Sequence, residues 1–230
     1  MKTSKIMTVA TALLLALLLL SVSIAVPILV RPYYYIHIDA FDLPSQTGFT
    51  KDEIKNAYNQ MLDYCVGKTE EFSTGVFAWS EDGKSHFDDV SRLFKLDFAV
   101  IAVCGVALVA LLLIKLKCHV RFKKILGRGP FFWSAVGLAV PFAIVGCLAA
   151  IDFNRAFTVF HDIFFAGKEN WIFDSSRDEI ITVLPQDFFM NCAILILALM
   201  LLGCAVFVVV DLLVFREKSV YEPTKIPVHA

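Results

Sequence analysis

Two of the five histidines in this 230-residue chain have neighbours suited to proton transfer. His86 is followed by Asp88 and Asp89, and His161 is followed by Asp162 within a phenylalanine-rich stretch. Histidine is the side chain best suited to move protons near neutral pH, and two histidines can act as base and acid, or as base and orienting group. The alternative is that both are polar residues at a membrane surface, satisfied by the nearby carboxylates.

The other histidines and the known catalytic motifs indicate no different chemistry. His37 follows an aromatic run, His119 lies in a basic segment and His229 is close to the C-terminus. The chain contains no G-x-S-x-G, H-E-x-x-H or Walker sequence. The six cysteines lie mostly in apolar stretches, so neither a disulfide framework nor a zinc site is expected.

Four uncharged stretches could cross a bilayer: 25 residues after Lys5, 17 after Asp97, 23 after Arg128 and 23 after Asp187. A bilayer core requires about 20 helical residues, and in lipid a helix satisfies its own backbone. We therefore predict an all-α membrane protein that forms one integral membrane domain, residues 1–230. The predicted spans are about 6–30, 96–114, 130–151 and 188–212, and the outer loops are 31–95 and 152–187.

The first stretch has two interpretations. Lys2 and Lys5 precede an apolar run that contains Ser23-Ile24-Ala25, which resembles the small-x-small cleavage site of a signal peptide. The apolar run continues to Val30, beyond the usual length of a signal sequence, which favours a retained anchor. The topology of the remaining chain is the same in both cases.

The distribution of charge predicts the orientation. The N-terminus, segment 115–128 and the C-terminal tail hold eleven basic residues, whereas the outer loops hold ten basic and 18 acidic residues. Because Lys and Arg concentrate on the cytoplasmic side, both termini are expected inside and both loops outside. Asp211 is expected near Arg216 at the cytoplasmic interface. The net charge of -1 gives no indication of nucleic-acid binding, and the lack of charge at mid-depth argues against an ion-coupled transporter.

The outer loops are expected to form a small α/β head. The run from Tyr33 to Phe41 is aromatic and β-branched, which is typical of a strand or a membrane-surface segment. Thr50 and Glu53 predict a capping box for a helix that ends near Gly67. Residues 72–79 are predicted to form a short strand.

The helix that carries His86 is expected to begin at Ser85, with Asp88 at its third position. His86 would then lie in the first turn, where the helix dipole favours a neutral imidazole. Asp89 lies on the same face and has the opposite effect on the imidazole.

The second outer loop is expected to begin as a helical continuation of the third span. His161 and its phenylalanines recur there at helical spacing, and Gly167 is a plausible stop. Asp174 or Ser175 is expected to cap a further helix that ends at Pro185.

Two motifs resemble those of a known family. The pattern S-x-x-G-x-x-H-F-x-D-V, from Ser80 to Val90, is similar to a signature of the lipoprotein intramolecular transacylases, called Lit. The stretch FHDIFFAGKENWIFD, followed by DEIITVLPQDFF, is similar to another. Members are small bacterial proteins with four spans, and the spacing of spans and loops agrees along essentially the whole chain. The resemblance implies that the two essential histidines of the family are His86 and His161.

The resemblance also implies a reaction. The sn-2 acyl chain of an S-diacylglyceryl lipoprotein moves to the α-amino group of its N-terminal cysteine, which gives the lyso form. No cofactor is expected, since an amide replaces an ester, and the expected partners are the lipoprotein and membrane lipid. We expect His86 to be the base and His161 to orient or donate, with reversed roles as the alternative. The expected supporting residues are Ser80, Asp89, Arg155, Trp171 and Asp174.

Two other hypotheses remain open at this point. The acidic head and the lack of an obvious nucleophile are compatible with a non-enzymatic accessory or sensor protein. Ser80 is compatible with a serine- or metal-dependent lipid hydrolase. The separation of His86 and His161 discriminates best, because catalysis by two histidines requires both in one site.

Overall fold

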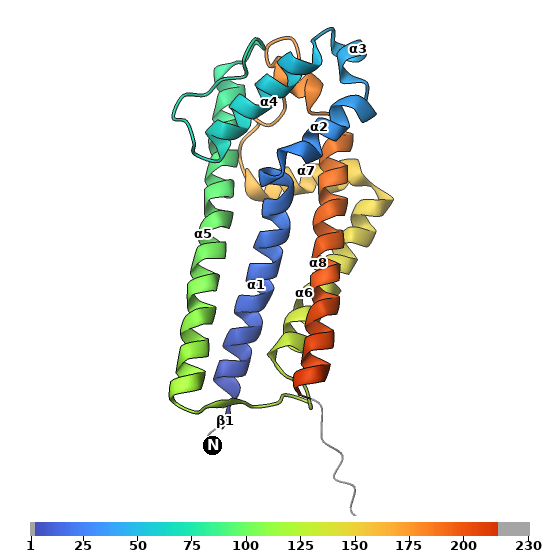
Figure 1. Cartoon of the computed structure of the whole chain (residues 1–230). Helices are drawn as coiled ribbons and strands as arrows, with labels where there is room; N and C mark the ends of the chain where they lie inside the picture. Colours follow the sequence, from blue (N-terminus) through green and yellow to red (C-terminus); the bar gives the residue numbers. More distant parts are fainter. Residues whose placement is uncertain (1–2, 216–230) are drawn as a thin grey trace, which may run out of the picture.

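The computed structural model describes residues 3–215 as four long apolar helices that carry a helical head at one end (Figure 1). Each of the long helices is apolar enough over a sufficient length to cross a membrane, and together they contain the four uncharged stretches. They are α1 (Lys5–Leu29), α5 (Glu81–Lys117), α6 (Pro130–Ile151) and α8 (Gln186–Val214). The chain is therefore a mainly helical, multi-pass membrane protein.

Helix α1 occupies the centre of the bundle. It packs against α5 on one side and against α6 and α8 on the other (Figure 1). Loss of α1 by cleavage would remove the helix that joins α5 to the rest of the bundle. This central position gives the expectation of a retained anchor a physical reason.

Helix α5 is longer than a bilayer requires, with 37 residues. Its first part, residues 81–95, carries seven charged residues and packs within the head. The uncharged part begins at Phe98, after Asp97. His86 therefore lies outside the membrane-spanning segment, about one turn below the top of the helix.

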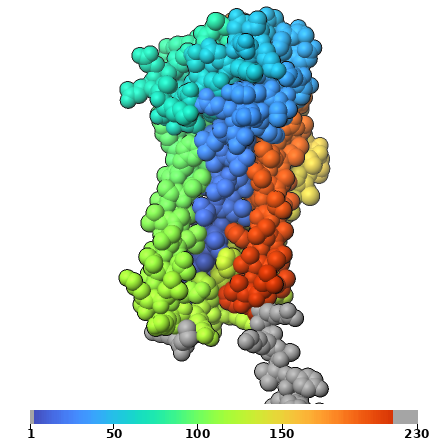
Figure 2. Space-filling view, viewed as in Figure 1, coloured from blue at the N-terminus to red at the C-terminus, as the bar shows by residue number. Residues whose placement is uncertain are grey.

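The head is formed by α2 (Arg31–Ala40), α3 (Leu43–Thr47), α4 (Lys51–Cys65) and the 3-10 helix η1 (Glu179–Val183). Figure 2 shows the part of the head from α2 to α4 as a continuous cap over the bundle. The capping box predicted at the start of α4 is confirmed: Thr50 N donates to Glu53 Oε2 at 2.8 Å, and Glu53 N donates to Thr50 Oγ1 at 3.3 Å. One buried cluster fills the head and reaches α8, and its largest side chains include Tyr34, Ile38, Leu43, Ile54, Tyr58, Ile180 and Phe188.

The predicted α/β character of the head is wrong. The run from Tyr33 to Phe41 lies largely in α2, because its buried residues Tyr34, His37 and Ile38 follow helical spacing and Pro32 favours a helix start. Residues 72–79 form turns rather than a strand. The two strands of the described chain, β1 (Thr3–Ser4) and β2 (Arg121–Phe122), pair in parallel at the opposite end of the bundle.

Helix α5 begins five residues earlier than predicted. Its N-cap is Ser80, whose Oγ accepts a hydrogen bond from Gly83 N at 3.1 Å, and not Ser85. The carboxylate of Asp178 holds this cap, because Ser80 N donates to Oδ1 at 2.7 Å and Ser80 Oγ donates to Oδ2 at 2.8 Å. The second outer loop thus fixes the start of the helix that carries His86.

The sequence predicted that the second outer loop begins as a continuation of the third span. Helix α7 (Phe153–Phe164) is instead a separate helix. The backbone leaves the helical region at Asp152, whose carboxylate accepts a hydrogen bond from Arg155 N at 2.9 Å and starts a new helix. Helix α7 then runs across the bundle beneath the head (Figure 1). The expected cap at Asp174 or Ser175 is also wrong, since Asp174 instead accepts from Ser176 within a turn.

Asp211, near the C-terminal end of α8, is a buried capping residue. It is fully buried, and its two oxygens accept hydrogen bonds from Gly129 N and Phe132 N, at 3.1 and 3.2 Å. These are unpaired donors at the start of α6, where a negative charge is favourable. Arg216 lies outside the described residues.

Replacement of Gly83 by alanine should destabilise the protein. The added Cβ would overlap Asp178 Oδ1 and lie 3.2 Å from Phe173 Cε1. Asp178 cannot withdraw without losing its hydrogen bonds to Ser80. Overpacking of this kind costs about 1–3 kcal/mol. We expect a lower melting temperature for Gly83→Ala in detergent, measured by a thermal-shift assay.

Gly105→Ala is the matched control, since it adds a methyl group to the same helix where nothing lies within 4 Å of the new Cβ. Its melting temperature should not fall. Equal melting temperatures for wild type and Gly83→Ala would show that the contact between Asp178 and α5 is looser than described.

Candidate active site

His86 lies in an aromatic pocket in the second turn of α5. Its ring centroid is 4.8 Å from that of Phe165 and 5.3 Å from that of Phe173, and the residue is only 6% exposed. Its Nδ1 atom is buried and has no hydrogen-bond partner in the described part of the chain. Buried polar atoms are nearly always paired, so an unpaired nitrogen here is suited to a substrate group.

His161 lies on α7 and is 7% exposed. Its Nδ1 is 2.7 Å from the carbonyl oxygen of Phe157, one turn earlier. A carbonyl only accepts, so Nδ1 carries the hydrogen and Nε2 of the neutral ring carries the lone pair. The indole of Trp171 covers the ring, with centroids 4.6 Å apart and an interplanar angle of 31°.

The imidazoles of His86 and His161 lie close together. Their ring centroids are 6.0 Å apart and their planes differ by 26°. The two residues are about 75 positions apart in the sequence and lie on different helices, and no feature of either helix alone requires the approach. The condition for a single site that contains both histidines is met, while their catalytic role stays a prediction.

Both imidazoles are neutral at pH 7. Burial is the main cause that lowers the pKa of His86, to about 4, and the neighbouring His161 lowers it further. Burial also lowers the pKa of His161, although the hydrogen bond to Phe157 and the charge of Asp162 partly oppose this. His86 is therefore neutral because it is buried, whereas the sequence analysis attributed its neutrality to the helix dipole. The helix dipole acts mainly in the first turn, and His86 lies beyond it.

Asp89 anchors the loop that covers the histidines. Burial alone would raise the pKa of Asp89, but hydrogen bonds from Lys168 and Asn170 outweigh it and lower the pKa. Lys168 Nζ is 2.6 Å from both carboxylate oxygens, and Asn170 Nδ2 is 3.2 Å from Oδ2. Arg92 pairs with the same carboxylate at 2.9 Å. Asp89 is thus a positioning residue that fixes residues 168–171 against α5.

The other residues expected to support the site have different positions. Trp171 contacts His161, as described above. Ser80 caps α5 and is bonded to Asp178, which leaves its hydroxyl unsuited to act as a nucleophile. Arg155 and Asp174 are exposed, and neither contacts the histidines within residues 3–215.

Two polar residues that frame the site, Asn170 and Asp178, were not singled out from the sequence. Phe165 and Phe173 enclose His86, Asn170 bonds Asp89, and Asp178 holds Ser80. Only Asp178 had a usable signal, because a carboxylate in the second loop could be expected to meet a helix N-terminus. The aromatic residues were indistinguishable from the rest of a phenylalanine-rich stretch. Within residues 3–215, no three His, Cys, Asp or Glu side chains form a group suited to a metal ion.

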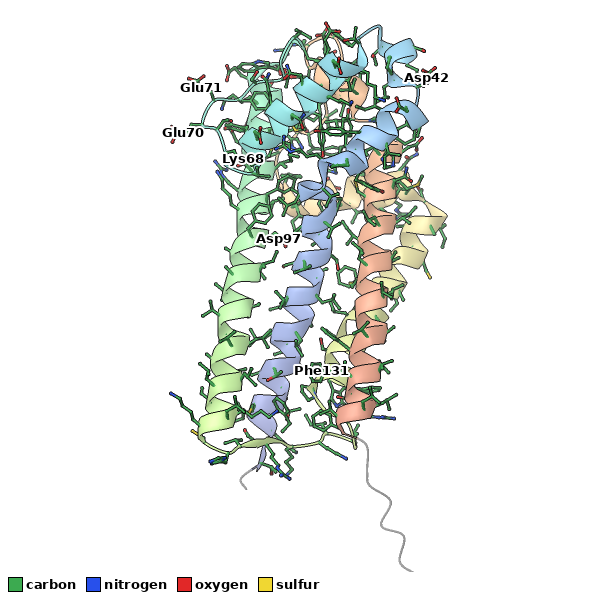
Figure 3. All side chains as sticks on the ribbon, in the orientation of Figure 1. Asp42, Lys68, Glu70, Glu71, Asp97 and Phe131 are labelled. Atoms are coloured by element: carbon green, nitrogen blue, oxygen red, sulfur yellow. The ribbon has the colours of Figure 1, made fainter. Side chains whose placement is uncertain are left out.

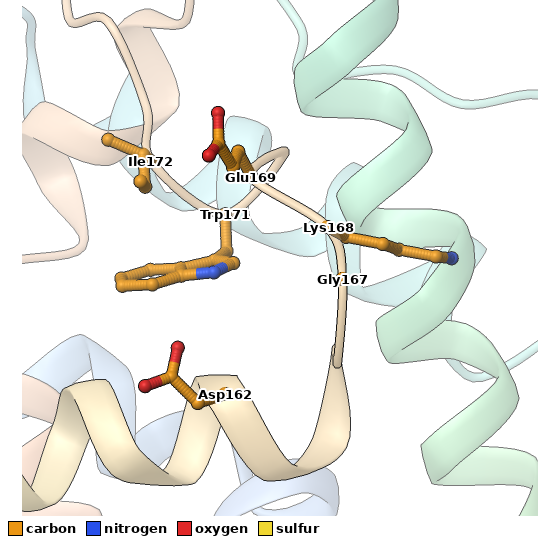
Figure 4. A pocket seen from close by; sticks show the side chains of 6 residues that line it. All are labelled: Asp162, Gly167, Lys168, Glu169, Trp171 and Ile172. Carbon is orange, nitrogen blue, oxygen red and sulfur yellow. The ribbon is translucent and has the colours of Figure 1, made fainter.

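A pocket of about 580 Å³ lies beside the histidine pair (Figure 4). It is lined by Asp162 on α7 and by the covering loop, through Gly167, Lys168, Glu169, Trp171 and Ile172. Trp171 forms a wall of this pocket and also stacks on His161. The pocket is therefore adjacent to the site, although neither histidine lines it.

The fold and the site define a class: a multi-pass membrane protein with two buried, neutral histidines where the apolar bundle meets a polar head. Residues 9–189 match the family model described as lipoprotein intramolecular transacylase Lit. The chain belongs to this family, and its function is acyl transfer within lipoproteins, as the family name states.

Solved structures agree with the family assignment. The membrane-integral lipoprotein intramolecular transacylase Lit from Bacillus cereus is 26% identical, with a TM-score of 0.79 over 89% of this chain and 92% of that one. A variant of the Bacillus cereus protein with a histidine-to-arginine mutation is 24% identical and has a TM-score of 0.74 over 89% of this chain and 88% of that one. Comparison with curated protein sequences gives no match.

Acidification should destabilise the protein through the histidine pair. In the unfolded chain a histidine takes up a proton near pH 6.5, whereas folded His86 does so only near pH 4. Between these values the unfolded state binds the extra proton, so stability falls as the pH falls, by up to about 1.4 kcal/mol per pH unit. We expect the stability of His86→Gln to fall less than that of wild type between pH 6.5 and 4.5.

Denaturant unfolding in detergent at several pH values measures this difference. The His161→Gln variant should show a reduction in the same direction. Parallel stability curves for wild type and His86→Gln would mean that the folded state does not exclude the proton.

Proposed function

We propose that the chain moves the sn-2 acyl chain of an S-diacylglyceryl lipoprotein to the α-amino group of its N-terminal cysteine. The product is the lyso form, which is N-acylated and S-monoacylglycerylated. The single observation that carries the proposal is the meeting of His86 and His161, with ring centroids 6.0 Å apart, at the junction of bundle and head. This junction suits a diacylglyceryl cysteine, because its acyl chains lie in lipid and its peptide lies in water.

The reaction requires one bond to form and one to break. The substrate binds with its α-amino group as the free amine, having lost one proton to water. The nitrogen attacks the sn-2 ester carbonyl, and the tetrahedral intermediate expels the glycerol oxygen. The attacking nitrogen gives up a proton and the glycerol oxygen takes one, so a single group can carry out both transfers.

His161 is the residue best arranged to transfer that proton. The carbonyl of Phe157 holds its Nδ1–H, which leaves Nε2 free to accept. The charge of Asp162 raises the pKa of His161, whereas His161 itself lowers the pKa of His86. The first proton taken up by the pair therefore resides on His161. This assignment reverses the roles expected from the sequence.

His86 is suited to stabilise the oxyanion. A neutral imidazole can donate a hydrogen bond without carrying a charge, and its Nδ1 is the buried nitrogen without a partner. A preorganised donor in a dry pocket commonly contributes about 3 kcal/mol of transition-state stabilisation. Lys168 and Arg155 are less suited to this role, because Lys168 is bound to Asp89 and Arg155 is exposed.

Acyl chains would reach the site from the membrane side of α7. Phe160 and Phe164 are about half exposed on this helix, and Ile163 between them is more exposed. The strongly amphipathic helix crosses the bundle beneath the head, as an interfacial helix does. Intramolecular transfer then needs only the folding of one acyl ester towards the amine, which proximity accelerates.

The orientation is part of the proposal. We place both termini in the cytoplasm of a bacterial cell and the histidine pair at the outer face of its membrane. Lys115 and Lys117 lie in the last turn of α5, and Arg121 and Arg128 lie in the connection from α5 to α6, at the end of the bundle opposite the head. Basic residues of this kind concentrate in cytoplasmic connections.

Substitution of either histidine should abolish the lyso product. His86→Ala removes the proposed oxyanion donor and His161→Ala removes the proposed base, and each loss should reduce transfer at least a hundredfold. The readout is mass spectrometry of the N-terminal peptide of a reporter lipoprotein. His119→Ala, an exposed histidine at the other end of the bundle, is the control. Full lyso product in either test variant would exclude that residue from catalysis.

Cysteine labelling tests the orientation. Cys118 is exposed in the basic connection, and Glu70 is exposed in the head. A membrane-impermeant maleimide applied to intact cells should label the Glu70→Cys variant at position 70 but label Cys118 only after permeabilisation. Labelling of Cys118 in intact cells would reverse the assigned topology.

A further inference from the structure

The pocket beside the histidine pair is open to one side and is not filled by any described part of the chain. Figure 4 shows it between α7 and the covering loop, with Asp162 on one wall and Trp171 and Ile172 on the other. Asp162, Glu169 and Ile172 are exposed, while Trp171 is partly buried. Its volume of about 580 Å³ lies within the range of ligand sites, roughly 300–1,000 Å³.

The pocket lies next to His161, through Asp162 and Trp171. Asp162 directly follows His161 in the sequence, and Trp171 has one contact with the pocket and another with the His161 ring. A substrate whose α-amino nitrogen reaches His161 must direct the rest of its peptide away from lipid. The Asp162 side of α7 is polar, whereas Phe160, Ile163 and Phe164 present an apolar surface.

The charge of the pocket is negative. Lys168 is the one basic residue among its lining residues, and its ammonium group points to α5, where it binds both oxygens of Asp89 (Figure 4). The carboxylates of Asp162 and Glu169 have no hydrogen-bond or ion-pair partner among residues 3–215. The pocket therefore presents two uncompensated carboxylates beside an aromatic wall.

We propose that this pocket receives the residues that follow the acylated cysteine of the substrate, and that Asp162 and Glu169 make it select basic over acidic residues there. The inference rests on the proposed function, because it assumes that the α-amino group is placed at the histidine pair. Trp171 and Ile172 accommodate the apolar stem of a lysine or arginine, and the indole face also attracts its cation. An acidic residue meets like charges, which repel it.

Competing reporter lipoproteins test the selection. Three reporters carry lysine, glutamine or glutamate at each of the three positions after the cysteine, and the lyso product of each is quantified by mass spectrometry with the wild-type protein in proteoliposomes. Interactions between exposed charges change rates modestly, so we expect about a fivefold to tenfold excess of lysine over glutamate product at low salt. High salt should reduce the ratio.

The pocket variants localise the effect. Asp162→Asn combined with Glu169→Gln keeps side-chain size and should bring the lysine-to-glutamate ratio close to one, while Glu169→Lys should favour the glutamate reporter. The control is Glu70→Gln combined with Glu71→Gln, which removes two carboxylates at the edge of the head (Figure 3) and should retain the wild-type ratio. Ratios within one preparation do not depend on the amount of folded protein.

The outcomes separate the two proposals. A wild-type ratio within twofold of one, or a ratio that persists in the pocket double variant, would overturn the charge selection while the transacylation remains. Absence of N-acylated product from all three reporters would overturn the proposed function itself.

Discussion

The carboxylate of Asp178 at the start of α5 is the interaction on which the site depends. It accepts hydrogen bonds from Ser80 N and Ser80 Oγ, and Ser80 in turn accepts from Gly83 N. A negative charge at a helix N-terminus is favourable, and burial makes the hydrogen bonds costly to break. This contact joins the second outer loop to the helix that carries His86. Gly83 permits it, because any larger residue would occupy the space of the carboxylate.

A second contact, one turn beyond His86, completes the frame. Asp89 binds Lys168 and Asn170, and Trp171 then lies over the His161 ring. The two carboxylates on either side of His86 thus hold one loop at two points. Between them, Phe165 and Phe173 exclude water from the imidazole. Exclusion of water keeps the histidines neutral and strengthens any hydrogen bond that they make to a developing charge.

The arrangement suits a reaction between two parts of one amphipathic molecule. In the proposed reaction, ester and amine belong to the same substrate, so the protein needs to hold a conformation and move a proton rather than bring two reactants together. Helix α7 separates the environments, with Phe160 and Phe164 on its apolar face and Asp162 bordering the pocket. The histidine pair lies at this boundary, where chains in lipid and peptide in water can both be accommodated.

The sequence by itself determined the four membrane helices and the capping box at Thr50, because these depend on local composition and spacing. It also singled out His86 and His161 as candidates for catalysis. The sequence could state that the two histidines must lie close together, but it could not show their separation. A strand was considered around Tyr33 because aromatic and β-branched residues favour strands. Such residues also occur in buried helices, and packing in the head stabilises the helix here. Only tertiary structure decided that α5 starts at Ser80, that the chain turns at Asp152, and that His86 and His161 meet. The start of α5 and the approach of the histidines depend on contacts between segments about 75 to 100 residues apart, and the turn at Asp152 depends on a backbone break that hydrophobic spacing alone does not record.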